Sequence, residues 1–221
     1  MSFAREGYPF IGVGLLLAGA AWAGVTTEYG GWWLKGFAVV FTVLTFFTVW
    51  FFRDPAPGTP SEAGLVVAPG QGKVISITEE DEPTFMGGRA RRITIFLSVF
   101  DVHVQRAPVS GTVVHRVYKP GKYLVAWAEK ASQDNEQSSL GISTGAGPVL
   151  VRQIAGLIAR RIVTDHSEGD SVERGARIGL IRFGSRVDLF IPLEWEVVCS
   201  VGDRVRVGST VLARHPVDTD A

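Results

Sequence analysis

The chain has 221 residues, 46% of them hydrophobic, and its 22 basic residues are matched by 22 acidic residues, so its formal net charge is zero. Charges of both signs are interspersed, without the basic stripe that contacts phosphates in duplex-binding domains, so nucleic acid is excluded as a partner. The single cysteine, Cys199, excludes an internal disulfide bond and a cysteine-rich metal site.

Two uncharged apolar stretches open the chain, from Gly7 to Thr27 and from Gly36 to Phe52. As α-helices at about 1.5 Å per residue they would extend roughly 31 Å and roughly 26 Å, against a hydrocarbon core of about 30 Å. We therefore predict a membrane hairpin in residues 1–54, with spans at about 7–27 and 36–52. Tryptophans that suit the membrane interface lie near the ends of the second stretch: Trp32, Trp33 and Trp50.

The alternative for the first stretch is a cleaved secretory signal. Its charged start is only Arg5 beside Glu6, however, and a second apolar segment follows closely, which favours the hairpin. A hairpin returns to its starting side, and Arg5 and Arg53 favour the cytoplasmic side, although Lys35 in the loop opposes this. We expect the protein in the cell (inner) membrane, with the body of the chain on the cytoplasmic face.

The body begins after a stiff connector that contains Pro55, Pro57 and Pro60. We place a linker at residues 55–62, a β-rich domain at 63–212 and a tail at 213–221. Short β-branched runs separated by glycine predict antiparallel strands. The expected strands are 65–67, 73–77, 91–97, 112–118, 123–126, 186–191 and 204–207, and residues 149–162 leave strand and helix both open. The fold class is thus mainly β, a β-rich α+β soluble domain with an N-terminal two-helix transmembrane hairpin.

The pair Gly184-Ser185 precedes the strand-like run that starts at Arg186. Some decarboxylases cut a Gly-Ser bond in themselves to make a pyruvoyl group. The same dipeptide recurs at Gly208-Ser209, and most such pairs are ordinary turns, so other motifs must support this interpretation.

Three motifs accompany Gly184-Ser185 in order. They are Phe-Phe-Arg-Asp-Pro at residues 51–55, Phe-Asp-Val-His-Val-Gln-Arg-Ala-Pro at 100–108, and Gln-Ile-Ala-Gly at 153–156 ahead of Ala-Arg-Arg-Ile at 159–162. Together they resemble the short, pyruvoyl-dependent form of phosphatidylserine decarboxylase, and the resemblance runs from about Phe51 to Val207.

The resemblance implies autocatalytic cleavage between Gly184 and Ser185. The β chain (1–184) and the α chain (185–221) would stay together as a heterodimer, with a higher homo-oligomer left open. Ser185 would become the pyruvoyl cofactor, with no metal and no pyridoxal phosphate. That group would form a Schiff base with phosphatidylserine in the bilayer, and loss of carbon dioxide would give phosphatidylethanolamine. Glycine at 184 would supply the backbone freedom that the attack needs.

Proton transfer in this chemistry calls for histidine. Of the four histidines, His103 is the acid/base candidate, because Asp101-Val102-His103 matches the family motif. His115 falls in a strand-like run, His166 in a polar loop and His215 in the tail.

Two positions depart from the longer family members. Arg106 stands where they carry a second histidine, and Gln71 stands where they carry an aspartate that pairs with histidine. Glutamine cannot be an anionic partner. Asp101 or another carboxylate replaces it, or maturation is slow, or the protein is a degenerate homologue.

Five arginines include candidates for binding the lipid phosphate or the serine carboxylate, and the sequence selects none: Arg152, Arg160, Arg161, Arg182 and Arg186.

A second hypothesis comes from two related stretches, residues 68–74 and 107–113, which follow the manner of lipoyl and biotinyl carrier domains. Lys130 would then be the modified lysine of a membrane-anchored carrier or adaptor without decarboxylase activity. This hypothesis leaves the motifs at 51–55, 101–103 and 184–185 unexplained.

Overall fold

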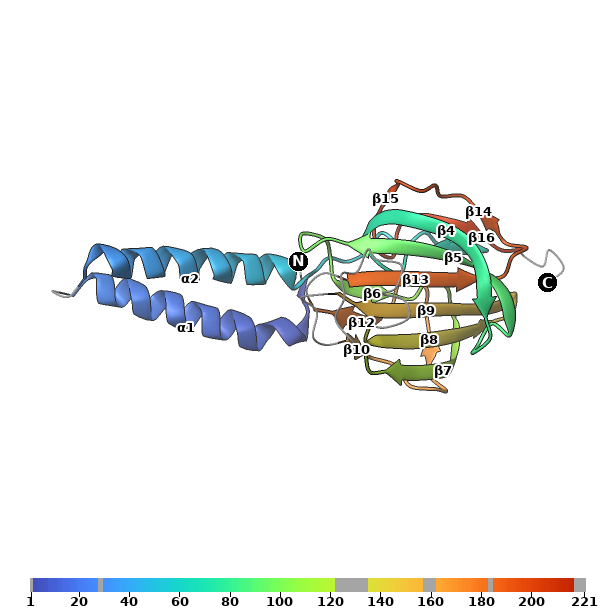
Figure 1. Ribbon diagram of the computed structural model, residues 1–221, viewed down its shortest axis with the longest axis horizontal. Helices are drawn as coiled ribbons and strands as arrows, with labels where there is room; N and C mark the ends of the chain where they lie inside the picture. Colours follow the sequence, from blue (N-terminus) through green and yellow to red (C-terminus); the bar gives the residue numbers. More distant parts are fainter. Residues whose placement is uncertain (1, 28–29, 122–134, 157–161, 183–184, 217–221) are drawn as a thin grey trace. The chain divides into compact units, whose positions relative to one another are not determined.

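A computed structural model describes residues 2–27, 30–121, 135–156, 162–182 and 185–216. The chain divides into two compact units, Met1–Ala56 and Pro57–Ala221. Figure 1 shows a helical first unit and a second unit built from strands.

The first unit is a hairpin of α1 (Tyr8–Val25) and α2 (Trp32–Phe51). Glycine allows the helices to approach closely, since a Cβ on Gly14 would lie 2.6 Å from the Thr45 hydroxyl and one on Gly24 would lie 2.7 Å from the Leu34 side chain. At the open end of the hairpin, β1 (Ser2–Phe3) pairs with β2 (Arg53–Asp54), after which η1 (Arg5–Gly7) leads into α1.

Both helices are long and apolar enough to cross a membrane, by length and composition. The threonine hydroxyls of α2 bond to the carbonyl four residues earlier, as Thr42 and Thr45 each do at 2.7 Å, which leaves an apolar exterior. The first helix is slightly shorter than the expected 7–27, and the second begins four residues before the expected Gly36, so that Trp32 and Trp33 lie inside it.

The second unit contains an eight-stranded antiparallel sheet in the order β11-β7-β8-β9-β13-β5-β4-β15. Its strands are β4 (Gly72–Glu82), β5 (Gly88–Leu97), β7 (Gly111–Lys119), β8 (Gln137–Thr144), β9 (Gly147–Ala155), β11 (Ser171–Val172), β13 (Ser185–Ile191) and β15 (Arg204–Val205). All seven residues of the inner strand β13 are buried between β5 and β9.

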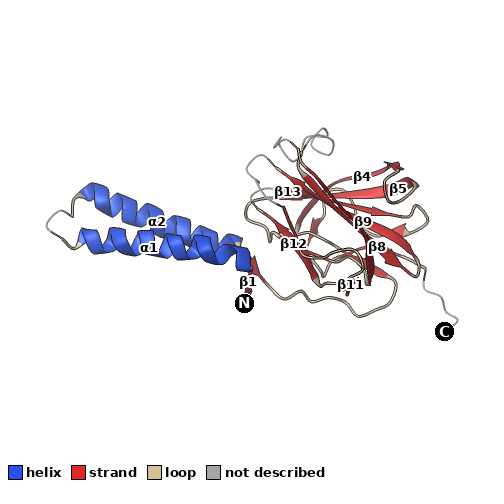
Figure 2. Cartoon of the chain, turned by 90° about the horizontal axis from the view of Figure 1, so that it is seen from below, coloured by secondary structure: helices blue, strands red, loops and turns tan. Residues whose placement is uncertain are grey.

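Two three-stranded sheets cover one face of the large sheet (Figure 2). One is β10 (Ile162–Thr164), β12 (Arg177–Ile181) and β6 (Val104–Arg106), and the other is β14 (Glu196–Val197), β16 (Val211–Arg214) and β3 (Leu65–Val67). Their apolar side chains form one core with Val187, Leu189 and Ile191 of β13. We call this the inner face of β13, and the face that carries Arg186, Asp188 and Phe190 the outer face.

The two related stretches of the sequence occupy equivalent places in the fold. The N–H of Val67 donates to the carbonyl of Pro108 at 2.9 Å, and the N–H of Arg106 donates to that of Pro69 at 3.1 Å, so each stretch holds the other. A second pair of segments, residues 167–181 and 200–214, also corresponds. In each segment an aspartate carboxylate, that of Asp170 or Asp203, accepts from the N–H of the serine three residues earlier. The strands of the two small sheets are therefore related by an approximate internal duplication.

Several strands differ from the sequence-based expectation. Those over β3, β4, β5, β7 and β13 were anticipated, whereas the strand expected at 204–207 covers only 204–205 and the one at 123–126 lies outside the described residues. Residues 149–155 are strand, and 157–161 also lie outside the described part. The polar β8 was missed, because its serines are buried by tertiary packing. Strand β16 runs to Arg214 and so passes residue 212, the expected end of the domain.

Candidate active site

Ser185 is the first residue of β13, opposite Leu97 of β5 and Ala155 of β9. Strand alternation places its side chain on the inner face with Val187. The residue is fully buried, and its Oγ has no hydrogen-bond partner among the described residues. An unmet buried hydroxyl costs about 1–3 kcal/mol, so a reason other than stability is needed for a serine here. Gly184 lies outside the described residues.

His103 lies in the loop between β5 and β6 and is fully buried. Its carbonyl oxygen accepts from the N–H of Ile181 at 3.3 Å, which ties the loop to a point four residues before Ser185. Its Nδ1 lies 3.0 Å from the backbone oxygen of Asp101. A carbonyl oxygen can only accept, so Nδ1 carries a hydrogen, and when the ring is neutral Nε2 is its basic nitrogen.

Asp101 uses its carboxylate elsewhere. One carboxylate oxygen accepts from both the N–H (2.9 Å) and the hydroxyl (2.7 Å) of Ser98, the residue that follows Leu97. The other oxygen lies 3.8 Å from a guanidinium nitrogen of Arg204. Asp101 therefore meets His103 through its backbone, and its charge stabilises the turn that carries the histidine.

Gln71 belongs to the turn between β3 and β4. A Cβ on the preceding Gly70 would lie 3.4 Å from Val187 and 3.5 Å from Leu97, so this turn packs on the side chains next to Ser185. Gln71 and Asp101 line one cavity of about 280 Å³. The fold thus gathers the turn with Gln71, the loop with Asp101 and His103, and Ser185 at the same end of β13.

A buried pair of glutamines near Ser185 was missed by the sequence analysis. Gln153 stands opposite Val187, which makes it a diagonal neighbour of Ser185 on the inner face. Its amide nitrogen donates to Gln105 Oε1 at 2.9 Å, while its oxygen accepts from the hydroxyl of Thr164 at 3.1 Å. The amide nitrogen of Gln105 is buried without a partner among the described residues. The available signal was a glutamine at an inward-facing strand position within each family motif.

The five candidate arginines differ in whether they are already paired with a carboxylate of the protein. Arg186 makes a bidentate ion pair with Asp188, at 2.7 and 2.9 Å, and both residues are buried on the outer face. Arg152 contacts Glu82 at 2.6 Å. Arg182 is only half-buried and precedes β13, while Arg160 and Arg161 lie outside the described residues. Arg152 and Arg186 are thus committed to carboxylates of the protein itself.

The setting of Glu82 shows how strongly the outer face is paired. Burial disfavours its charge, but the backbone N–H groups of Phe85 (2.8 Å) and Met86 (3.1 Å) and the guanidinium of Arg152 outweigh that cost. Together they lower the pKa of Glu82 below its usual value.

The remaining histidines lie away from Ser185. The His115 ring stacks on Phe85 with centroids 5.2 Å apart, and Nε2 of His166 donates to the carbonyl of Arg177 at 2.9 Å. The expectation of a loose tail at His215 was wrong. Its N–H donates to the carbonyl of Gly64 at 2.8 Å, and its ring lies 4.9 Å from that of Trp195.

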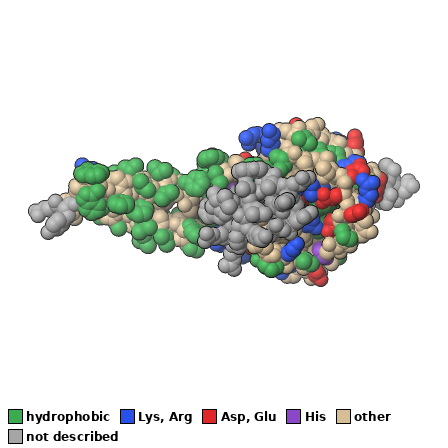
Figure 3. Space-filling view, in the orientation of Figure 1, with side chains coloured by type: hydrophobic (Ala, Val, Ile, Leu, Met, Phe, Trp, Pro, Cys, Tyr) green, Lys and Arg blue, Asp and Glu red, His purple; other side chains and the backbone are tan. Residues whose placement is uncertain are grey.

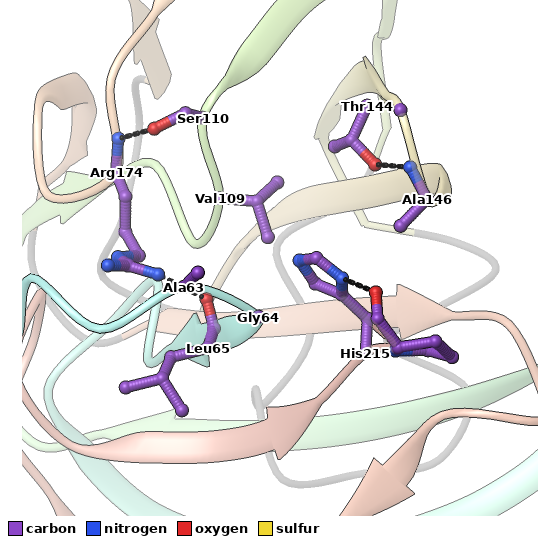
Figure 4. Close-up of a pocket in the computed structure, with 11 residues that line it drawn as sticks. Ala63, Gly64, Leu65, Val109, Ser110, Thr144, Ala146, Arg174 and His215 are labelled. Carbon is purple, nitrogen blue, oxygen red and sulfur yellow. Dashed lines mark hydrogen bonds between the residues drawn. The ribbon is translucent and has the colours of Figure 1, made fainter. Parts of the chain in front are cut away.

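His215 lines the larger cavity, of about 630 Å³, together with Val109, Ser110 and Thr144 (Figure 4). The guanidinium of Arg174 at its wall donates to the carbonyls of Leu65, Pro60 and Glu62. The β8–β9 hairpin that borders this cavity is at the opposite end of β9 from Ala155, so the cavity is remote from Ser185.

Other chemistries find little support. No group of three or more His, Cys, Asp or Glu that could hold a metal occurs in the described ranges. Burial raises the pKa of the Cys199 thiol to about 11, which disfavours the nucleophilic thiolate. Lys130 lies outside the described residues.

Comparison with known proteins identifies relatives over most of the chain. The phosphatidylserine decarboxylase family model matches residues 44–213. The phosphatidylserine decarboxylase proenzyme of Symbiobacterium thermophilum is 48% identical over 214 residues, which cover 96% of this chain and 95% of the relative. That of Citrifermentans bemidjiense is 47% identical over 218 residues, 96% of each chain, and that of Salinibacter ruber is 50% identical over 173 residues, 77% of this chain and 76% of the relative.

Proposed function

The chain belongs to the phosphatidylserine decarboxylase family, and from this premise we propose that it converts phosphatidylserine to phosphatidylethanolamine with a pyruvoyl group made from its own Ser185. The observation that carries the proposal is Ser185 itself, a fully buried serine whose hydroxyl has no partner among the described residues. It begins the inner strand β13, in the motif that the sequence analysis singled out.

Maturation begins with attack of Ser185 Oγ on the carbonyl carbon of Gly184. The peptide C–N bond breaks as the ester C–O bond forms, and the nitrogen of Ser185 becomes an amine. A base then removes the α-proton of Ser185, the bond between Cβ and the ester oxygen breaks, and residues 1–184 leave as a carboxylate. The dehydroalanine that remains takes up water and releases ammonia, which leaves a pyruvoyl group at the head of residues 185–221.

The surroundings of Ser185 fit this chemistry. No hydrogen bond competes for its hydroxyl among the described residues, and the strand neighbours Leu97, Ala155 and Val187 give it apolar surroundings on the side away from the Gln105–Gln153 pair. A pyruvoyl group there would supply the electron sink that ordinary side chains lack. An apolar site also favours loss of a carboxylate as neutral carbon dioxide, because the charged ground state is poorly solvated.

We assign the acid/base role to His103. Its Nδ1 is held by the carbonyl of Asp101, so Nε2 is the atom that exchanges protons. The Gln105–Gln153 pair has a positioning role beside Ser185, since the chain of hydrogen bonds through Thr164 fixes both amides. Asp101 supports maturation by holding the loop of His103 through Ser98, and Gln71, which lines the same cavity as Asp101, is the second candidate for a maturation partner.

The helical hairpin serves as the membrane anchor. A diacyl lipid scarcely leaves the bilayer, so an enzyme that acts on its headgroup benefits from attachment to the surface. We place the protein in the inner membrane with its decarboxylase domain on the cytoplasmic face. The full chain should then sediment with membranes and resist extraction by carbonate, and release by carbonate would contradict the anchor.

The decisive assay is turnover of phosphatidylserine by the full chain and by Ser185→Ala. The unsubstituted chain should release carbon dioxide and form phosphatidylethanolamine, and Ser185→Ala should do neither. Ser209→Ala, which alters the second Gly-Ser pair, is the matched control and should remain active. Full turnover by Ser185→Ala would overturn the proposal. The carrier hypothesis has no separate support, because the family match accounts for the motifs that it leaves unexplained.

A further inference from the structure

The side-chain amide of Gln105 is a hydrogen-bond donor that the fold leaves unused. Gln105 is fully buried, and its Nε2 has no partner among the described residues. Its Oε1 is already occupied, because it accepts from Nε2 of Gln153 at 2.9 Å, and the hydroxyl of Thr164 fixes the other end of Gln153. A buried N–H without an acceptor lowers the stability of the fold, so a bound molecule that brings an acceptor would supply what the protein lacks.

The strand register connects this donor to Ser185. Gln153 stands opposite Val187 on the inner face, so its Cα lies one diagonal, roughly 7–8 Å, from that of Ser185. The small sheet packs directly on this point, since a Cβ on Gly179 would lie 2.9 Å from the amide nitrogen of Gln153. Gln105 pairs with Gly179 in that sheet, and its side chain meets Gln153 there.

Gln105 also shares a face of its strand with the acid/base candidate. The bond from the N–H of Ile181 to the carbonyl of His103 extends the pairing of β12 and β6 by one residue. Side chains two residues apart on a strand point to the same side, so His103 and Gln105 both face the inner face of β13.

The surroundings of the Gln105 amide carry no lysine or arginine that could bind an anion in its place. The inner-face positions of β9, from Val149 to Ala155, and those of β13 hold no charged side chain. Figure 3 shows Lys and Arg side chains on the surface of the strand unit. Arg106, next to Gln105 in the sequence, lies on the other face of β6, where its guanidinium donates to the carbonyl of Gly175 at 2.9 Å.

We propose that the amide N–H of Gln105 donates to the carboxylate of phosphatidylserine and thereby distinguishes the substrate from its product. The proposal rests on the proposed function and names a specificity-determining residue for it. Phosphatidylethanolamine has the same amine and phosphate and lacks only the carboxylate, so only a group that contacts the carboxylate can favour the substrate. A carboxylate oxygen of a substrate bound at Cα of Ser185 is four bonds away, roughly 5 Å, and a hydrogen bond of about 2.9 Å spans the rest of the diagonal.

A single neutral N–H suits a carboxylate that must leave. An arginine would stabilise the charged ground state more than the transition state, in which that charge is lost, and so would slow decarboxylation. A neutral amide binds a carboxylate more weakly than a guanidinium does, so it orients the group at a smaller cost in rate. The rest of the carboxylate would meet the apolar side chains around Ser185, where its charge is poorly solvated.

The test measures headgroup binding to the mature chain after borohydride has reduced its pyruvoyl group. Reduction of the keto carbon to an alcohol prevents covalent attachment and turnover, so titration calorimetry reports binding alone. Gln105→Met, which keeps the length of the side chain and loses the N–H, should weaken binding of glycerophosphoserine about 10- to 100-fold and leave binding of glycerophosphoethanolamine unchanged. Thr94→Val, which alters a buried polar residue on the outer face, is the matched control and should keep both affinities.

Turnover gives a second readout. Gln105→Met should raise KM for phosphatidylserine about 10- to 100-fold with a much smaller change in kcat, and the inhibition constant of phosphatidylethanolamine should stay the same. If Gln105→Met does not cut itself, Gln105→Asn replaces it and should show a smaller loss in the same direction, because its N–H is one methylene shorter.

Three results would overturn the assignment. They are an unchanged preference for glycerophosphoserine, an equal loss of affinity for both headgroups, which a merely structural role would give, and failure of both variants to cut themselves, which would assign the amide to maturation. An unsubstituted chain that turned over no phosphatidylserine and held no reducible carbonyl would instead refute the proposed function.

Discussion

The two faces of strand β13 treat polar groups in opposite ways. On the outer face, Arg186 and Asp188 are buried and bond to each other twice, and the neighbouring, partly buried Arg152 contacts the buried Glu82 at 2.6 Å. On the inner face, the Ser185 hydroxyl and the Gln105 amide nitrogen are buried without partners among the described residues. Both faces belong to one strand, so secondary structure does not cause the difference.

This contrast distinguishes polar groups that stabilise the fold from polar groups that are kept for the reaction. A buried charge is tolerated when its partner satisfies it, and the outer face meets that condition. A buried hydroxyl without a hydrogen-bond partner lowers the stability of the fold and is retained where function requires it. Replacing outer-face residues should therefore reduce stability, and replacing inner-face residues should reduce activity.

The largest effect is expected at His103 on the inner side. His103→Ala should slow self-cleavage, decarboxylation or both by about a hundred- to ten-thousand-fold, the usual contribution of a general acid or base. The fraction of chain cut with time after synthesis, read on a gel, and phosphatidylserine turnover measure the two steps. His166→Ala is the control and should mature normally. Normal cleavage and turnover in His103→Ala would remove the assignment.

On the outer face, Asp188→Asn should lower the free energy of unfolding by about 3–5 kcal/mol, because Arg186 is left as a buried charge without its anion. Urea unfolding should be compared in the Ser185→Ala background, so that every chain is uncut. Glu79→Gln, which alters an exposed pair with Arg91, should have little effect. If Asp188→Asn unfolded like its parent, the outer face would not be the stabilising one.

The pH dependence of stability should distinguish Glu82. Its pKa is lowered in the folded protein, so its carboxylate stabilises the fold above its unfolded pKa of about 4.3, and that stability is lost as the pH falls through the folded pKa. Glu82→Gln should lower the free energy of unfolding at pH 7 by about 1.5–3 kcal/mol, with a shallower loss on acidification. Urea midpoints at pH 7 and pH 4 check both points. Equal acid sensitivity of the two chains would contradict this role.

The smallest effects are expected at Gln71 and Asp101. Gln71→Asp should leave self-cleavage unchanged or accelerate it, because aspartate can hold a charged histidine and glutamine cannot. Asp101→Asn should impair cleavage, since its carboxylate holds the loop of His103 through Ser98. Time courses of cleavage serve for both variants. A folded Gln71→Asp chain that failed to mature would show that the site is organised differently from that of the longer relatives.

The sequence was most informative where a pattern reflects a local physical requirement. Uncharged stretches long enough for a bilayer anticipated both helices, and alternating β-branched residues anticipated β5 and β13. The pair Gly184-Ser185 and the motif around His103 identified the candidate site through the family resemblance.

The rest depended on tertiary contacts. The glutamines at 105 and 153 read as ordinary polar residues until the register of β9 and β13 placed Gln153 beside Ser185. Arg186 was a candidate for lipid binding, and only the fold revealed its pairing with Asp188. Likewise, His215 looked like part of a tail because the ring that it contacts, Trp195, is 20 positions away in the sequence.

The central claim is that Ser185 is converted into the catalytic group, and the intact mass of the purified protein tests it most directly. The account predicts two chains, a larger one of residues 1–184 and a smaller one that starts at position 185 and is lighter than the encoded peptide by one ammonia. Ser185→Ala should give a single uncut chain. A single full-length chain in a preparation with full decarboxylase activity would contradict the account.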